Sequence, residues 1–280
     1  MVGGEKIFGR QCINIPWSQL TSFRSDSLCL VTEILPILRS CRNLESLYLE
    51  VYIDEPDFNE GDGFVLQLDN LTSMTVEVDY SDWPLIFFQK MKCMRLPALK
   101  TLNIACSFKE SWVEAFISAL SHSGCCGSLT RFGITGCLGD GRLKEILAVL
   151  PHLKDLSVST RGWYNHIGEY GIPFGPLVMQ GLGLHGSSPS SSTLVPHLLC
   201  LELSLGDDRF DYNEFAIMVA SRWNPAAKGS QMAGEQEVVA CLESVRLLTN
   251  SSFDKDTDAY RRLQNMKAQG LDLTIGRRWP

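Results

Sequence analysis

The sequence predicts an α/β fold in which parallel strands line one side of an array and helices cover the other. Two observations support this prediction. The hydrophobic pattern L-x-x-L-x-L recurs along the chain, and each interval between copies is long enough for a crossing helix. The copies begin near residues 20, 44, 71, 99, 129, 153, 198 and 242.

The segment Leu44-Glu-Ser-Leu47-Tyr-Leu49 shows why this pattern indicates a repeat. Successive side chains of a strand alternate between its two faces, so Leu47 and Leu49 point to one side. Leu44, just before the strand, turns toward the same core. One such strand cannot bury its apolar face alone, whereas a stack of them can. The pattern therefore predicts a leucine-rich-repeat solenoid, a horseshoe with a parallel concave β-sheet and convex helices.

The chain divides into a short lead and one repeat array. Residues 1–19 are expected to form an N-terminal lead or a cap over the first open edge of the sheet. Residues 20–280 carry about eight irregular leucine-rich repeats. The rhythm breaks at 160–197, which we interpret as an inserted loop rich in glycine and aromatic residues. Its serine-rich stretch at 187–192 is expected to be mobile.

Apolar residues at helical spacing predict the helices between these strands. They cover 27–40, 83–91, 111–120, 141–150, 213–222 and 257–268, with a short helical turn near 177–182. Pro36 should bend or shorten the first helix. Ser111 should cap the third helix, and Gly270 should end the last one before a closing strand over 271–275.

Composition limits the partners and the compartment. The net charge is −7, and the lysines and arginines are scattered, so the sequence does not favour a nucleic-acid partner. No signal peptide and no apolar run of membrane-spanning length are recognisable, so we expect no membrane association and a cytoplasmic or nuclear location. The ten cysteines are then expected to be reduced thiols rather than a disulfide framework.

Three local patterns suggest chemistry but have simpler interpretations. Gly181-x-Gly183-x-x-Gly186 resembles a phosphate-binding loop, yet a serine-rich stretch follows where a helix would have to open, so we interpret it as a flexible loop. Cys125-Cys126 with His122 lacks the spacing of a metal site and indicates a helix-ending turn. His152 and His197 each follow a proline and precede a repeat leucine, which is typical of a polar turn residue. We therefore expect no catalytic residue, no cofactor and no metal, and no enzymatic activity.

The third, fifth and seventh residues of each repeat point away from the core, onto the concave face. Together with aromatic and acidic residues at the strand ends, they are the candidate protein-binding residues, because aromatic and charged side chains often anchor a partner. The alternative is a solvated sheet face with no specific role. The candidates are Tyr48, Glu50, Tyr52, Thr75, Glu77, Asp79, Asn103, Arg131, Asp155, Trp163, Tyr164, Glu202 and Arg246.

Four segments resemble one protein family. They are Ile15-Pro-Trp17-Ser-Gln-Leu20-Thr, Ile37-Leu-Arg39-Ser-Cys41-Arg-Asn43-Leu44-Glu-Ser-Leu47, Ser221-Arg-Trp223 and Gly270-Leu-Asp-Leu273. With these segments the chain is similar to fungal, basidiomycete-type F-box proteins with irregular leucine-rich repeats. The resemblance implies a substrate-recognition subunit of a Skp–cullin–F-box ubiquitin ligase. An F-box is not recognisable, because Val31 stands where the family has proline, so we expect the repeat portion only.

The leading hypothesis is therefore a protein-binding leucine-rich-repeat module, the substrate-recognition part of an F-box-type ubiquitin ligase subunit. A Skp-type adaptor and a cullin are expected partners only if an F-box precedes this chain. The alternative is a free-standing repeat scaffold or inhibitor with no ligase role. A third hypothesis, a hydrolase-like enzyme that uses 160–197, would require a deep pocket with a perturbed histidine or cysteine.

Overall fold

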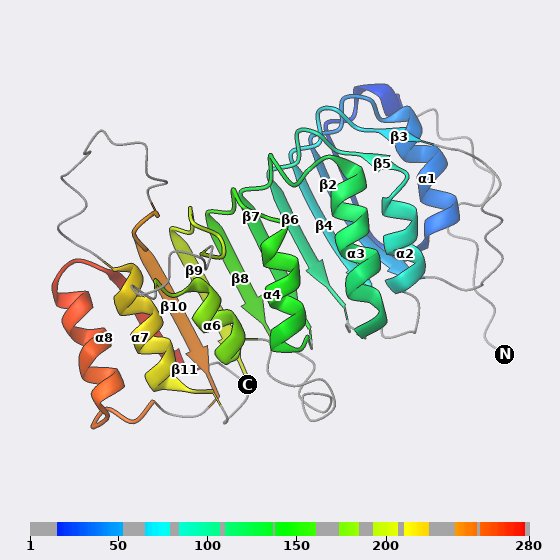
Figure 1. Ribbon diagram of the computed structural model, residues 1–280. Coiled ribbons are helices and arrows are strands. Elements are labelled where there is room, and N and C mark those ends of the chain that lie inside the picture. The colour runs from blue at the N-terminus through cyan, green and yellow to red at the C-terminus, as the bar shows by residue number, and fades with distance from the viewer. Residues whose placement is uncertain are drawn as a thin grey trace, which may run out of the picture.

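The computed structural model describes residues 16–52, 65–78, 84–106, 110–136, 138–160, 174–184, 193–206, 210–223, 239–250 and 253–277. It is an α/β structure built on one nine-stranded parallel sheet whose strands follow one another in chain order (Figure 1). The strands are β1 (Ser22–Leu30), β2 (Ser46–Tyr52), β4 (Ser73–Val78), β6 (Thr101–Ala105), β7 (Arg131–Thr135), β8 (Asp155–Ser159), β9 (Cys200–Leu205), β10 (Ser244–Thr249) and β11 (Asp272–Arg277).

The seven α-helices of the described residues all lie on one face of this sheet (Figure 1). They are α1 (Val31–Ser40), α2 (Pro84–Met91), α3 (Glu110–Ser123), α4 (Asp140–Ala148), α6 (Pro176–Leu182), α7 (Tyr212–Arg222) and α8 (Asp258–Ala268). The 3-10 helix η1 (Trp17–Gln19) precedes β1, and β3 (Leu66–Gln67) pairs with β5 (Met94–Arg95) in a small second sheet. We call the face of the main sheet opposite the helices the open face. None of the described helices crosses a membrane: each is too short or too polar.

One hydrogen-bond motif joins each strand to the strand before it. Two consecutive amides at the start of a strand donate to a single carbonyl of the preceding repeat. The amides of Thr130 and Arg131 donate to the Lys100 carbonyl at 3.0 and 2.9 Å, and those of Lys154 and Asp155 donate to the Thr130 carbonyl at 2.8 and 3.0 Å. The same motif recurs from the start of β2 to the start of β10. We call this series the carbonyl ladder, and it fixes the register of the sheet.

Because of this register, the repeat hydrophobes form continuous layers in the core. The side chains at the second position of successive strands are buried and lie beside one another. They are Leu47, Met74, Leu102, Phe132, Leu156, Leu201, Val245 and Leu273. The helices close the core from the other side, where the ring of Phe116 lies 4.9 Å from that of Phe88 and 6.1 Å from that of Phe132. Burying such a side chain contributes about 1.5–3 kcal/mol, so each strand depends on its neighbours.

The structure corrects several predicted boundaries. The first helix begins at Val31 rather than at residue 27, because β1 continues to Leu30 and pairs with β2 across an irregularity between Ser25 and Cys29. Pro36 lies inside α1, so the helix continues through it. The third helix begins at Glu110, so Ser111 lies within its first turn and is not the residue that precedes it.

Glycine ends two helices as the sequence predicts. Gly124 follows α3 with φ +75°, and Gly270 follows α8 with φ +102°, a region that residues with a side chain rarely adopt. Sequence periodicity did not predict the small β3–β5 sheet, because strands of two residues are too short to show alternation.

The long segment between β8 and β9 contains α6, which lies beside α4 and α7 in the helix layer (Figure 1). Asp140, at the start of α4, fixes the beginning of α6. Its carboxylate accepts hydrogen bonds from the amides of Gly175, Leu177 and Val178 at 3.0, 2.6 and 2.9 Å. These amides have no partner within their own helix, and a negative charge at a helix N-terminus is favourable. The Ser-rich stretch at 187–192 lies outside the described residues.

A buried arginine holds together the loops on the other side of α6. The side chain of Arg222, at the end of α7, is 1% exposed. Its Nη1 donates to the carbonyls of Leu182, Leu194 and Val195 at 3.3, 3.4 and 3.1 Å, and its Nη2 donates to that of Pro196 at 3.0 Å. Burial lowers the pKa of Arg222 to about 10, which leaves the guanidinium protonated at neutral pH.

We predict that Arg222→Met lowers the free energy of unfolding by about 3 kcal/mol or more, because several buried carbonyls lose their donor at once. Arg222→Lys should cost less, since it keeps the charge but loses the planar fork. Urea unfolding of the purified chain measures both changes. Arg261→Met, which removes an exposed arginine from α8, is the matched control and should change the free energy by less than about 0.5 kcal/mol. A similarly small change in Arg222→Met would contradict the role assigned to this residue.

Candidate functional site

The open face presents outward side chains in rows that cross the strands. The register places the first residue of each strand beside the first residue of its neighbours, and the third beside the third. The first row is Ser46, Ser73, Thr101, Arg131, Asp155, Cys200 and Ser244, continued by Asp272. The second row is Arg24, Tyr48, Thr75, Asn103, Gly133, Ser157, Glu202 and Arg246.

Most of the predicted concave residues lie in these rows. Arg131 and Asp155 are in the first row, and the second row contains Tyr48, Thr75, Asn103, Glu202 and Arg246. Glu50 and Glu77 are register partners in a third row. Tyr52 ends β2 beside Leu30. Asp79, Trp163 and Tyr164 lie outside the described residues.

At the N-terminal end of the sheet, the second row begins with an aromatic and charged group. The guanidinium carbon of Arg24 lies 4.1 Å from the ring centroid of Tyr48, a cation–π contact between register partners. Partial burial, and then the hydrogen bond and charge of Glu77, raise the pKa of Tyr48 above its ordinary value. The Tyr48 hydroxyl is therefore protonated at neutral pH and is a donor.

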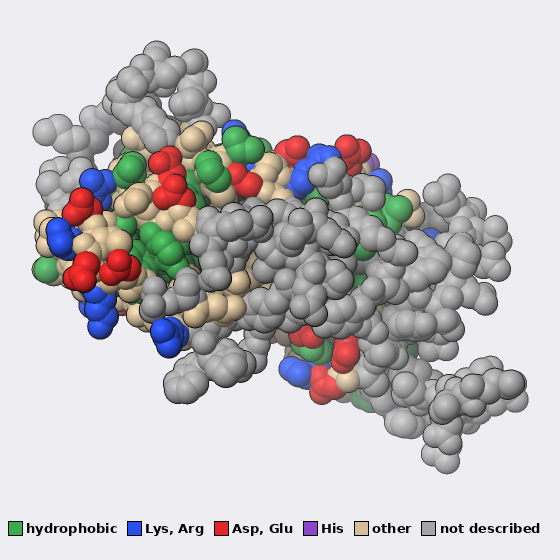
Figure 2. Space-filling view, turned by 90° about the horizontal axis from the view of Figure 1, so that it is seen from below, with side chains coloured by type: hydrophobic (Ala, Val, Ile, Leu, Met, Phe, Trp, Pro, Cys, Tyr) green, Lys and Arg blue, Asp and Glu red, His purple; other side chains and the backbone are tan. Residues whose placement is uncertain are grey.

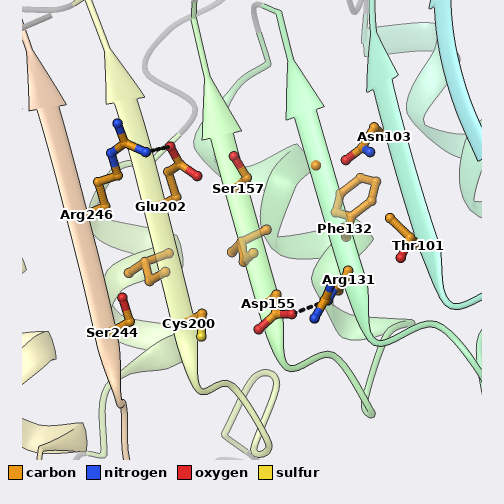
Figure 3. Close-up of a pocket in the computed structure, with 13 residues that line it drawn as sticks. Thr101, Asn103, Arg131, Phe132, Asp155, Ser157, Cys200, Glu202, Ser244 and Arg246 are labelled. Carbon is orange, nitrogen blue, oxygen red and sulfur yellow. Dashed lines mark ion pairs between the residues drawn. The ribbon is translucent and has the colours of Figure 1, made fainter. Parts of the chain in front are cut away.

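Near the middle of the sheet, the open face carries a hollow of about 480 Å³ across β6 to β10 (Figure 3). Its depth follows from small side chains at the centre of the second row, where Gly133 and Ser157 stand between Asn103 and Glu202. The Asn103 side chain lies over Gly133, as the distance between them shows: a Cβ atom added to Gly133 would be 2.2 Å from Asn103 Oδ1. The hollow is as large as many ligand sites, and most of the residues that line it have polar or charged side chains, although Phe132, Leu156 and Leu201 also contribute to it.

Two ion pairs stand on opposite sides of the hollow (Figure 3). Arg131 Nε lies 2.6 Å from Asp155 Oδ2 in the first row, and Arg246 Nη1 lies 3.3 Å from Glu202 Oε1 in the second row. Both pairs join register partners on adjacent strands. Exposed pairs of this kind contribute roughly 0.2–1 kcal/mol each, so their main effect is to orient the four charged groups.

Cys200 is a half-buried thiol in the first row of the hollow. Burial, and then the hydrogen bond and charge of Asp155, raise its pKa to about 11. The nucleophilic form of cysteine is the thiolate, so Cys200 is a poor nucleophile at neutral pH. The hollow therefore offers hydrogen-bond donors, carboxylates and guanidinium groups for binding, and its thiol is in the wrong protonation state for covalent chemistry.

The other predicted patterns lie away from this hollow. Gly181 is in the last turn of α6 and Gly183 follows it, which corrects the flexible loop expected there, while Gly186 lies outside the described residues. The rings of His152 and His197 stack with centroids 6.0 Å apart and planes at 11°, in corresponding turns before β8 and β9.

Cys125 and Cys126 follow α3 in the turn that begins at Gly124. The Cys125 thiol is buried, and hydrogen bonding between the two thiols raises the pKa of Cys125 and lowers that of Cys126. The exposed His122 ring has its Nδ1 2.7 Å from the Ser118 carbonyl of its own helix. Among the described residues, no group of three or more histidine, cysteine, aspartate and glutamate side chains is placed to hold a metal ion.

The repeat pattern of the sequence predicted which residues form the outward-facing rows, but it did not predict the hollow. Gly133, Ser157 and Cys200 shape it, and their positions in the repeat identify them as outward-facing, yet repeat spacing carries no information on depth. The role of Arg222 was also missed. A signal existed, because Arg222 follows Phe215 and Val219 on the apolar stripe of α7, where a solvated arginine would not be expected.

We predict that iodoacetamide alkylates Cys126 at least about tenfold faster than Cys200 at pH 8, because the pKa of Cys126 is lowered while that of Cys200 is raised to about 11. Both thiols are half-buried, so access alone does not separate them. Mass spectrometry of tryptic peptides after timed alkylation measures the two rates. Asp155→Asn removes a charge that raises the pKa of Cys200 and should accelerate its alkylation. Equal rates for the two cysteines would contradict this electrostatic description.

Comparison of the chain with models of protein families and with curated proteins gives no match.

Proposed function

We propose that this chain is a leucine-rich-repeat solenoid that binds a protein partner through its open face, which corresponds to the concave face of such a horseshoe. The sequential order of the nine strands, their common register and the restriction of the described helices to one face support the fold. In repeat proteins of this kind, the extended sheet face is the usual binding surface.

The observation that carries the binding proposal is the hollow with its two oriented ion pairs. Beside it, the first row continues into the small polar side chains of Ser73 and Ser46. Seen from below, the described part of the molecule shows acidic and basic side chains interspersed (Figure 2). At the hollow itself, the two ion pairs bring both signs together, which suits recognition of a mixed-charge protein segment better than binding to a polyanion.

The role within a ubiquitin ligase rests on the family resemblance of the sequence alone. In that role the repeat array presents a substrate to a ligase, and an F-box outside this chain contacts a Skp-type adaptor. The alternative is a free-standing scaffold or inhibitor that uses the same face with no ligase. An enzymatic function receives less support, because the raised pKa of Cys200 keeps its thiol protonated.

We predict that Ser157→Trp reduces recovery of the protein partner by at least about tenfold in affinity capture with mass spectrometry, because the indole fills the floor of the hollow. Lys144→Trp, which places the same ring on the exposed surface of α4, should leave recovery unchanged. Matching urea midpoints would show that both variants fold. Partner recovery that survives Ser157→Trp would contradict binding through the open face.

The same capture experiment separates the two candidate roles when the full-length gene product is the bait. Under the ligase role, a Skp-type adaptor and a cullin accompany the partner, and both persist with Ser157→Trp, because they bind outside the open face. Recovery of a partner with neither adaptor nor cullin would reject the ligase role and leave the scaffold.

A further inference from the structure

The charged residues of the hollow follow an order across four successive strands. Arg131 is on β7, Asp155 on β8, Glu202 on β9 and Arg246 on β10, so the signs are positive, negative, negative and positive (Figure 3). The two carboxylates are therefore central and the two guanidinium groups lie outside them. Each guanidinium holds the carboxylate beside it, which fixes all four groups before a partner arrives.

The space between the carboxylates is open. Asp155 is in the first row and Glu202 in the second, so they lie diagonally across β8 and β9. Together with Ser157 and Cys200, the two carboxylate residues form a square on β8 and β9. Ser157 is the register partner of Glu202, Cys200 is that of Asp155, and both have small side chains. A cationic group that enters the hollow here meets a carboxylate on each side and small hydrogen-bonding groups below it.

The electrostatic environment of Cys200 agrees with this arrangement. Burial raises the pKa of the thiol first, and the negative charges of Asp155 and Glu243 raise it further, while Arg131 opposes them. The charges around the Cys200 thiol thus disfavour a further negative charge there, although Asp155 is paired with Arg131.

The spacing of the strands matches the spacing of side chains along an extended peptide. Adjacent strands lie about 4.8 Å apart, so the three intervals from β7 to β10 span about 14 Å. Arg131 is in the first row and Arg246 in the second, about 7 Å further along the strands, so their backbones are about 16 Å apart. In an extended peptide, alternate side chains point to the same face, and residues i and i+4 are about 13 Å apart. A segment that crosses these four strands diagonally, from the first row to the second, can place residue i near Arg131, residue i+2 over the two carboxylates and residue i+4 near Arg246, because the long arginine side chains cover the remaining distance of about 3 Å.

We propose, building on the proposed function, that the hollow binds an extended partner segment with the charge pattern acidic–x–basic–x–acidic. The central lysine or arginine enters between Asp155 and Glu202, and the outer carboxylates pair with Arg131 and Arg246. The existing ion pairs need not break, because a guanidinium has five N–H donors and each arginine contributes one nitrogen to its present pair. The pattern reads the same in both directions, so either chain polarity satisfies it.

An exchange of charges tests this proposal without removing any ion pair. The probe is a phage-displayed library of random dodecapeptides, selected on the immobilised full chain. The swapped variant combines Arg131→Asp, Asp155→Arg, Glu202→Arg and Arg246→Glu, which keeps both cross-strand pairs and inverts the order of signs. Glu114→Gln removes an exposed charge from α3, on the opposite side of the sheet from the hollow, and is the matched control. Urea unfolding checks that each variant is folded.

The native chain and Glu114→Gln are expected to enrich acidic–x–basic–x–acidic peptides at least tenfold over the input library, and the swapped variant should enrich basic–x–acidic–x–basic peptides. Loss of the selected peptides with Ser157→Trp would show that they bind the open face. If such peptides lack the charge pattern, this proposal is overturned and the proposed function stands. Peptides that survive Ser157→Trp, or no enrichment, would also overturn it, and the proposed function would then be judged by affinity capture alone.

Discussion

The carbonyl ladder is the constraint on which the rest of the structure depends. Each new strand begins with two amides that donate to one carbonyl of the repeat before it, as Thr130 and Arg131 do to Lys100. A backbone donor left unpaired in the core costs free energy comparable to a lost hydrogen bond, so the ladder leaves each strand essentially one register. The repeat hydrophobes then meet in layers because their strands cannot slide.

The same constraint builds the open face. Side chains that alternate with the buried ones are brought into rows, so residues 24 positions apart in sequence, Arg131 and Asp155, become direct neighbours. A row has no function by itself. A binding site becomes possible where the side chains of a row differ in size and charge from their neighbours. Here Gly133 and Ser157 are small residues in the second row, and a charged pair lies on each side of them. The site is thus a local departure from an otherwise regular surface.

Sequence spacing predicted the strands and most helices because the repeat imposes one periodicity on each. It failed where a contact between distant segments decides the outcome. The strand β1 continues past residue 27 because β2 offers it a partner, and α6 begins where Asp140 accepts its first amides. Arg222 is buried because carbonyls from three separate segments converge on it. For the site, spacing identified the outward-facing residues, whereas depth depends on side-chain size and pairing across strands.

The most direct test of the carbonyl ladder is amide hydrogen exchange followed by NMR. The ladder predicts that the paired amides of Thr130 and Arg131, of Lys154 and Asp155, and of Leu199 and Cys200 exchange at least about 10⁴-fold more slowly than in an unstructured peptide, since they open only with the central sheet. Exchange of these six amides at the unstructured rate would contradict the ladder, and with it the rows and the hollow that depend on its register.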